Sequence, residues 1–172
     1  MTPGVLPFFF VLNYAVSKYN RSMEYLTNSA EGTKTAAKKI IIKLLKRPHQ
    51  GALVLVLVGE LGAGKTTFVQ GLAKTLGVKE KILSPTFVIQ KRFMIYDLRF
   101  KNKFKNLYHL DCYRIENAKN LAGLGLEEIL KDKKNLVVIE WAERVANILP
   151  ADTVWLNFQH KGGDERRIKL KM

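Results

Sequence analysis

Residues 59–66 read Gly-Glu-Leu-Gly-Ala-Gly-Lys-Thr, and these residue types at this spacing suit the binding of a nucleotide's phosphates. The glycines permit positive φ angles, so that successive backbone N–H groups can point at phosphate oxygens. Lys65 would reach the β- and γ-phosphates, and the Thr66 hydroxyl would bind Mg²⁺. The alternative is a glycine-rich turn with a surface lysine. The spacing favours a nucleotide site made of Gly59, Glu60, Leu61, Gly62, Ala63, Gly64, Lys65, Thr66 and Thr67.

Two carboxylates each end a short apolar run further along the chain, Asp111 and Glu140. In open α/β sheets, ligands lie at the carboxyl ends of the strands, where a phosphate loop also lies. We therefore predict that both acids converge on the phosphates, where they could hold Mg²⁺ and orient or deprotonate the attacking water. The local alternative is that Asp111 caps a turn and pairs with Arg114, while Glu140 pairs with Arg144.

A third group of polar side chains is the sequence Ser-Pro-Thr-Phe at 84–87. Pro85 holds the backbone extended and would present the hydroxyls of Ser84 and Thr86 from a loop. The loop after the first helix of phosphate-binding proteins is often the switch that senses the γ-phosphate. Taken alone, these residues favour the alternative, a simple turn before an edge strand.

The elements around the glycine-rich stretch are those that such a loop needs. Residues 53–58 are apolar at every position, which is typical of a parallel strand buried on both faces. After the loop, apolar residues recur at helical spacing up to Leu76, and Gly77 would end the helix. Strand, helix and a further strand make a βαβ unit.

The remaining pattern predicts strands at 24–27, 87–93, 107–111, 136–140, 154–158 and 167–170, helices at 30–46 and within 117–130, and a turn at 161–164. The resulting fold class is α/β: a P-loop NTPase-like three-layer fold with a mostly parallel central sheet and antiparallel edge strands. The length of 172 residues suits one domain, with 47% hydrophobic residues to fill its core.

The chain carries a net charge of +14, which favours polyanions such as RNA, a nucleotide or an acidic protein partner. Ordinary solvated faces are the alternative. Residues 95–106 interleave basic side chains with Tyr96, Phe100 and Phe104 and are predicted to form a hairpin extension. They could contact RNA, or their aromatic rings could pack inward.

Cys112 is the single cysteine, so no internal disulfide can form, which agrees with a reducing cytoplasm. Residues 1–22 form an N-terminal extension whose apolar part, 5–16, is too short to span a bilayer. We interpret this extension as a start assigned too far upstream, or as an added strand or helix, and residues 23–172 as a single P-loop ATPase domain.

Four ordered blocks resemble the TsaE family, the small bacterial P-loop ATPases of tRNA threonylcarbamoyladenosine synthesis: residues 59–67, 84–87, 108–115 and 138–144. The likeness covers roughly residues 24–170. It implies ATP and Mg²⁺ as cofactors and an ATPase that acts on the complex of TsaB and TsaD. That complex, not this chain, would transfer the threonylcarbamoyl group to tRNA. The resemblance implies neither DNA nor a membrane as a partner.

By this resemblance, Lys65 and Thr66 bind phosphate and Mg²⁺, Glu140 is the second Mg²⁺ ligand, and Asp111 is the carboxylate that orients water. Ser84 and Thr86 match the family's switch loop, and Arg166 matches a basic nucleotide contact near the C-terminus. The chain departs from the family pattern at Cys112, at Glu60 and in the insertion at 95–106, none of which touches the proposed chemistry.

No arginine finger is placed by the sequence, so we expect slow ATP turnover by the chain alone and stimulation by its partners. Two alternatives are a small P-loop kinase, for which no lid segment is clear, and a basic RNA-binding module that uses ATP as a structural ligand.

Overall fold

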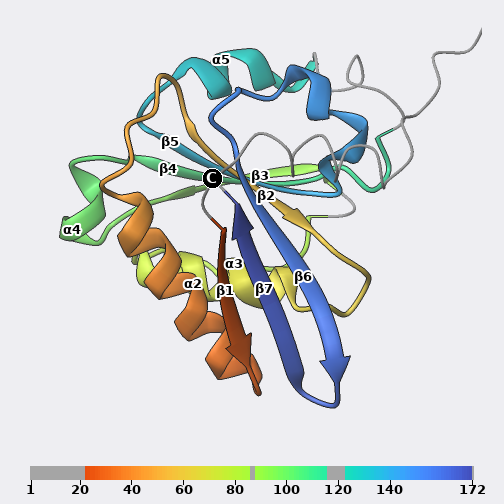
Figure 1. The fold of residues 1–172 in the computed structure, drawn as a ribbon. Coiled ribbons are helices and arrows are strands. Elements are labelled where there is room, and N and C mark those ends of the chain that lie inside the picture. Colours follow the sequence, from red (N-terminus) through yellow and green to blue (C-terminus); the bar gives the residue numbers. More distant parts are fainter. Residues whose placement is uncertain (1–21, 86–87, 116–122, 172) are drawn as a thin grey trace, which may run out of the picture.

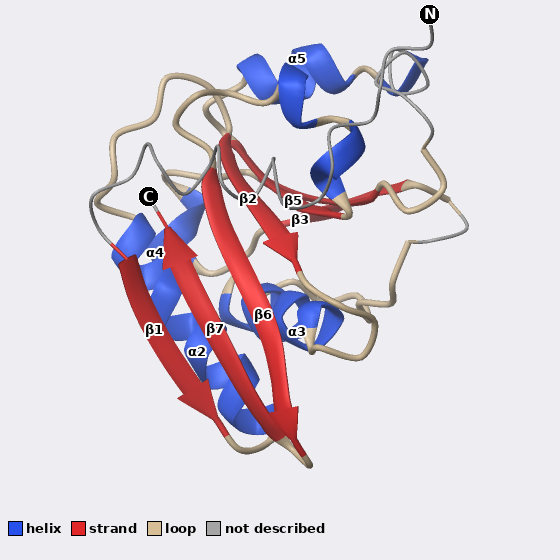
Figure 2. Ribbon diagram, turned by 45° about the vertical axis from the view of Figure 1, so that its right-hand side comes forward, coloured by secondary structure: helices blue, strands red, loops and turns tan. Residues whose placement is uncertain are grey.

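The computed structural model of this chain describes residues 22–85, 88–115 and 123–171 (Figure 1). The described strands form one sheet in the order β1-β7-β6-β2-β5-β4-β3, and helices cover both of its faces (Figure 2). The strands are β1 (Ser22–Thr27), β2 (Leu53–Val58), β3 (Gln90–Met94), β4 (Asn106–Asp111), β5 (Asn135–Glu140), β6 (Val154–Gly162) and β7 (Glu165–Lys171).

The helices are α2 (Ala30–Leu44), α3 (Lys65–Thr75), α4 (Leu98–Lys101), α5 (Leu126–Lys131), and the short 3₁₀ helices η2 (Ala142–Arg144) and η3 (Ala146–Ile148). Ser29 caps α2 by accepting a hydrogen bond from the N–H of Gly32, at 3.0 Å. The predicted helix and strand boundaries around the glycine-rich loop agree with α3 and β2.

The sheet is mixed, so the expectation of a mostly parallel sheet was wrong. The four central strands β6, β2, β5 and β4 are parallel, but β1, β7 and β3 pair antiparallel, and the antiparallel pairings join more residues. The reason lies in the connections, because a tight turn at Gly163 leads from β6 straight back into β7. The predicted antiparallel edge strands are present.

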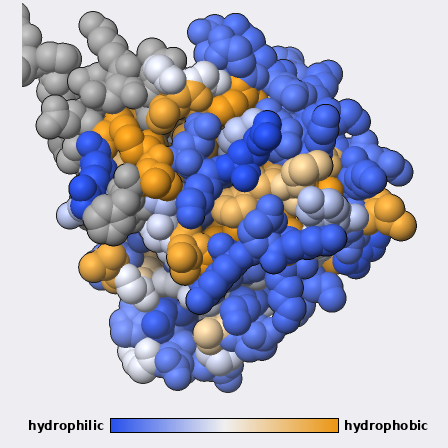
Figure 3. All heavy atoms as spheres, turned by 180° about the vertical axis from the view of Figure 1, so that it is seen from behind, coloured by the Kyte–Doolittle hydropathy of each residue, from blue (hydrophilic) through white to orange (hydrophobic). Residues whose placement is uncertain are grey.

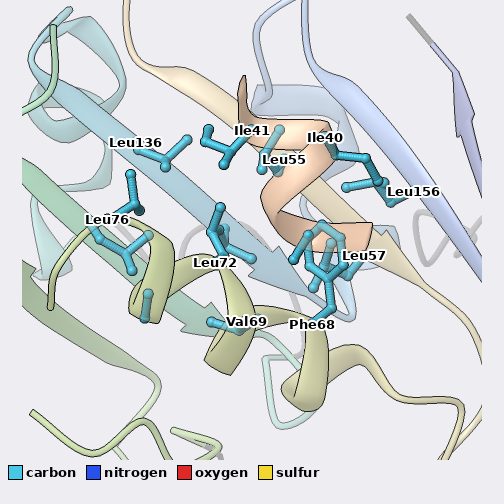
Figure 4. Packing of buried hydrophobic residues seen from close by; sticks show 14 of the residues in the cluster. Ile40, Ile41, Leu55, Leu57, Phe68, Val69, Leu72, Leu76, Leu136 and Leu156 are labelled. Atoms are coloured by element: carbon cyan, nitrogen blue, oxygen red, sulfur yellow. The ribbon is translucent and has the colours of Figure 1, made fainter. Parts of the chain in front are cut away.

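The larger core lies between the sheet and the helices α2 and α3 (Figure 4). Phe68 of α3 packs edge-on against Phe158 of β6, with ring centroids 5.4 Å apart. The two helices approach closely at Gly71, where an added Cβ would lie 2.4 Å from the Cα of Lys34. This contact fixes the position of α3, whose first residues follow the glycine-rich loop.

A smaller core covers the opposite face of the sheet, beneath α5, η2 and η3. Every residue of β2 and β5 is buried because both faces of these strands are covered. The expected three layers are therefore present.

The connection between β3 and β4 contains a helix, α4, where the sequence predicted a plain hairpin extension. Phe100 and Phe104 in it are fully buried, whereas Tyr96 is 41% exposed. Two of the three aromatic rings thus pack inward, which leaves the basic residues of this segment without the aromatic interleaving proposed for RNA contact.

Some predictions fall on parts of the chain outside the described residues. These are residues 1–21 of the N-terminal extension, Thr86 and Phe87 of the Ser-Pro-Thr-Phe block, and 116–122 of the predicted helical segment. Within the described ranges, no helix has both the length and the apolar composition needed to cross a membrane.

Candidate nucleotide site at the carboxyl ends of the central strands

The loop between β2 and α3 has the backbone conformation that its glycines allow. Gly59, Gly62 and Gly64 have φ angles of 148°, 75° and 95°. A side chain at Gly59 would also collide with β6, since an added Cβ would lie 2.4 Å from the carbonyl oxygen of Phe158. The chain can make this turn, at this distance from the neighbouring strand, only with glycine.

Lys65 begins α3 and turns its side chain back into the loop. Its Nζ donates hydrogen bonds to the carbonyl oxygens of Gly59, at 2.7 Å, and Glu60, at 2.9 Å, and lies 4.6 Å from the ring centroid of Trp141. Burial lowers the pKa of Lys65, and the charges of Glu140, Glu143 and Asp111 oppose that effect. The ammonium group is thus hydrogen-bonded to the loop, and the charges of three carboxylates favour its protonated form.

Glu140 ends β5 and joins three elements. Its Oε1 accepts a hydrogen bond from Thr66 Oγ1 at 3.3 Å and lies 2.9 Å from Nε2 of His109 on β4. His109 and Glu140 are both buried. His109 was not among the predicted site residues, and its only signal in the sequence is its place two residues before Asp111 on an apolar strand.

Asp111 ends β4 directly beside Glu140, its partner in the parallel register of β4 and β5. Its Oδ2 accepts a hydrogen bond from Ser84 Oγ at 3.0 Å, and its Oδ1 accepts one from the backbone N–H of Tyr113 at 2.9 Å. Asp111 therefore caps the following turn, which was one of the two predictions made for it. It also lies beside Glu140 at the glycine-rich loop, which was the other prediction.

These groups surround a cavity of about 560 Å³. The residues that line it are Leu61, Gly62, Gly64, Lys65, Thr66, Thr67, Ser84, Asp111, Tyr113, Glu140 and Trp141. Tyr113 and Trp141 contact each other edge to face, with centroids 5.2 Å apart. Trp141 has a φ of 58°, an uncommon conformation for a bulky residue. The Trp141 ring packs partly on the smaller core and partly lines the cavity.

The remaining predicted residues lie close by but outside the lining. Ala63 is buried under the loop. Arg166 lies beside Gly64, because a Cβ added there would be 3.9 Å from the Arg166 side chain. Its Nη1 donates to the carbonyl oxygens of Gly163 and Glu165, both at 3.0 Å, so the guanidinium is bound to its own turn.

The donor set fits a nucleotide with a divalent cation. The N-terminal amides of an 11-residue helix, together with Lys65, suit an anion. The hydroxyl of Thr66 and the carboxylate of Glu140 are the hard oxygen donors that Mg²⁺ prefers. Asp111 lies opposite Glu140 in the register of β4 and β5 and adds a second carboxylate that could orient a water molecule.

Fold and site together define an α/β protein with a glycine-rich strand–loop–helix at the carboxyl edge of its sheet. The family description "Threonylcarbamoyl adenosine biosynthesis protein TsaE" matches residues 27–168, so the chain belongs to the TsaE family. A relative from Treponema pallidum, named tRNA threonylcarbamoyladenosine biosynthesis protein TsaE, is 40% identical over 68% of this chain and 80% of its own length. The relative of that name from Bacillus subtilis is 34% identical over 86% of this chain and 84% of its own.

The solved structures include a similar protein, the crystal structure of YdiB from Bacillus subtilis. It superposes with a TM-score of 0.64 at 31% identity, covering 88% of this chain and 85% of its own. The family model and the named relatives confirm the sequence resemblance to the TsaE family, whose members are named for tRNA threonylcarbamoyladenosine biosynthesis.

Proposed function

We propose that this chain is the ATP-binding, Mg²⁺-dependent ATPase subunit of the tRNA threonylcarbamoyladenosine machinery. It is not itself the threonylcarbamoyl transferase. Membership of the TsaE family supports the pathway. The observation that carries the chemistry is the hydrogen bond between Thr66 and Glu140 beside the buried ammonium of Lys65.

In this proposal the loop and α3 bind the phosphates of ATP. Lys65 exchanges its bonds to the loop carbonyls for phosphate oxygens, and the amides at the start of α3 bind the same anion. Thr66 and Glu140 would hold Mg²⁺, which would supply positive charge beside the phosphate oxygens. The cavity of about 560 Å³ is large enough for the phosphates and for part of the nucleoside.

Asp111 orients the attacking water and accepts its proton. The water oxygen forms a bond to the γ-phosphorus, the bond from that phosphorus to the β–γ bridging oxygen breaks, and ADP and phosphate result. The Ser84 hydroxyl fixes one carboxylate oxygen of Asp111, and the Tyr113 N–H fixes the other. Catalysis would thus come from positioning and charge stabilisation.

The chain acts, in this proposal, on the complex of the TsaB and TsaD homologues in the cytoplasm. ATP hydrolysis resets that complex between turnovers, and tRNA is the substrate of the assembled machinery. Because the sequence offers no arginine finger, hydrolysis by the chain alone should be slow and should rise when both partners are added.

The test is phosphate release from ATP by the full chain, with and without TsaB and TsaD from the same organism. We compare the wild type with Lys65→Ala and Asp111→Asn, and with Lys131→Ala on the exposed face of α5 as the control. Partner-stimulated release that is lost in the first two variants alone supports the proposal. Release that ignores the partners, or transfer of γ-labelled phosphate to another acceptor, contradicts it.

A further inference from the structure

A second cavity lies at the amino ends of the central strands, at the end of the sheet away from the glycine-rich loop. Figure 1 shows the segments that form it together on the left: α4, the end of α2 and the connection from α5 to β5. Its volume is about 620 Å³. We call it the basic groove, after the six basic side chains among its lining residues: Arg47, His49, Arg99, Lys103, Lys133 and Lys134.

The charge in the basic groove is almost entirely uncompensated. Arg99 forms an ion pair with Asp97, at 2.7 Å. The other arginine and the three lysines make no ion pair with a carboxylate of the described residues, and no acidic side chain of those residues lines the groove. Several cations in one concave surface create a field that attracts an anion.

Two of the lysines are held in place by main-chain oxygens. Lys103 Nζ donates to the carbonyl of Leu45 and, at 3.1 Å, to that of Arg47, while Lys134 Nζ donates to the carbonyl of Asn102 at 2.8 Å. An ammonium group has three N–H donors, so each keeps at least one for a ligand. Cations positioned in advance lose less conformational freedom when they bind an anion.

Two further side chains suit a ligand that carries both phosphates and rings. Nη1 of Arg47 is buried and has no hydrogen-bond partner within the described part of the chain. An unsatisfied buried donor is unfavourable, and a bound anion could accept its hydrogen bond. The His49 ring stacks on Phe104, with centroids 5.7 Å apart and an interplanar angle of 25°. Phe104 is fully buried, so the half-buried His49 ring is the one that can stack on an unpaired base beside these cations.

We propose that the basic groove binds the phosphate backbone of RNA. The groove is open and its cations come from three separate segments, so it suits a series of phosphates better than one small anion. Hydrophilic side chains predominate on the right-hand side of Figure 3, with a hydrophobic cluster among them at the edge. The choice of RNA over an acidic protein rests on the proposed function in tRNA modification; the anion site itself does not.

The test is the binding of a fluorescein-labelled tRNA transcript to the full chain, followed by fluorescence anisotropy between about 50 and 200 mM KCl. The groove variant is the double substitution Lys133→Gln and Lys134→Gln. Its matched control is Lys91→Gln with Lys161→Gln, which removes the same charge from exposed positions on β3 and β6. Poly-L-glutamate, and inorganic phosphate at constant ionic strength, serve as competitors.

The groove variant should bind the transcript about tenfold more weakly, and the slope of log affinity against log salt should become shallower by about 1 to 2. The control pair should change both the affinity for the transcript and the salt slope by much less. Equal losses in both pairs, no measurable binding by the wild type at low salt, or displacement by either competitor as effective as by unlabelled RNA would overturn the proposal. Phosphate release from ATP, measured on the same variants, should be unchanged, so failure here is distinct from failure of the ATPase proposal.

Discussion

Thr66 and Glu140 are 74 positions apart in the chain, yet the threonine hydroxyl donates a hydrogen bond of 3.3 Å to the glutamate carboxylate. The pairing of β2 with β5 brings them together, since Glu140 lies opposite Leu57, at the end of the strand that leads into the loop. The same carboxylate oxygen contacts buried His109. The orientation of Glu140 is therefore fixed from two sides before any ligand binds.

Glu140→Gln should raise the Mg²⁺ concentration needed for half-maximal ATP hydrolysis by about tenfold or more, because an amide is a poorer ligand than a carboxylate for a hard cation. The measurement is phosphate release over a MgCl₂ titration. Glu127→Gln, on the exposed surface of α5, is the control and should leave the Mg²⁺ dependence as it is. An unchanged dependence in Glu140→Gln would exclude Glu140 as a ligand.

Asp111→Asn should lower the rate of ATP hydrolysis by about 10²- to 10⁴-fold and leave the affinity for ATP nearly unchanged, because Asp111 is proposed to act on the water and not on the nucleotide. Calorimetric titration with ATP and phosphate release measure the two effects separately. A loss of affinity as large as the loss of rate would show that Asp111 binds substrate.

Ser84→Ala should have a smaller effect of the same kind. It removes one hydrogen bond to the Asp111 carboxylate, worth about 1.5–3 kcal/mol, while the bond from the Tyr113 N–H remains. We expect a rate loss of about tenfold, with ATP affinity retained. If Ser84→Ala reduces activity as strongly as Asp111→Asn, then Ser84 contacts the substrate directly.

The sequence was most informative where a local pattern and a buried strand coincide. The apolar run at β2 and the spacing of the glycines led to the loop and to α3, and each carboxylate was predicted from its position at a strand end. His109 and Trp141 were not found as site residues, because a histidine or tryptophan in an apolar segment is most often part of the core. Their roles depend on the register of β4 with β5 and on the left-handed backbone at Trp141.

The hydrophobic pattern of the sequence also does not predict the direction of the outer strands. Alternation in β7 indicates a strand but not its direction, which is decided by the turn at Gly163 and by pairing with β1 at the other end of the chain. Likewise, basic residues near α4 were considered for RNA contact together with their aromatic neighbours. The structure separates the two groups by burying Phe100 and Phe104 in the core.

Gly71→Ala should destabilise the protein although alanine is the better helix former. The gain in helix propensity is about 1 kcal/mol, but the new methyl group would lie 2.4 Å from the backbone of Lys34, and such overpacking costs about 1–3 kcal/mol. We expect a net loss in the free energy of unfolding, measured by urea denaturation. Gly123→Ala is the control, since no described atom lies within 4 Å of its added Cβ. A more stable Gly71→Ala variant would mean that α2 and α3 can move apart freely.

Cys112 should contribute to stability at neutral pH and lose that contribution in alkali. Burial, with smaller effects from the charges of Asp111 and Glu143, raises the pKa of its thiol from 9.0 to about 12. Above pH 9.0 the unfolded chain releases this proton while the folded chain keeps it, so the free energy of unfolding falls as the pH rises toward about 12.

The measurement is the urea midpoint of the wild type and of Cys112→Ala across this alkaline range. Comparing the two removes the titration of lysines and tyrosines, which both proteins share, and the wild type should lose stability more steeply. Ellman's reagent at about pH 8 provides an independent check, because a buried, protonated thiol reacts slowly until the chain is unfolded. Parallel midpoint curves together with rapid labelling of the native protein would mean that Cys112 is accessible, and that the turn between β4 and Tyr113 opens readily beside Asp111.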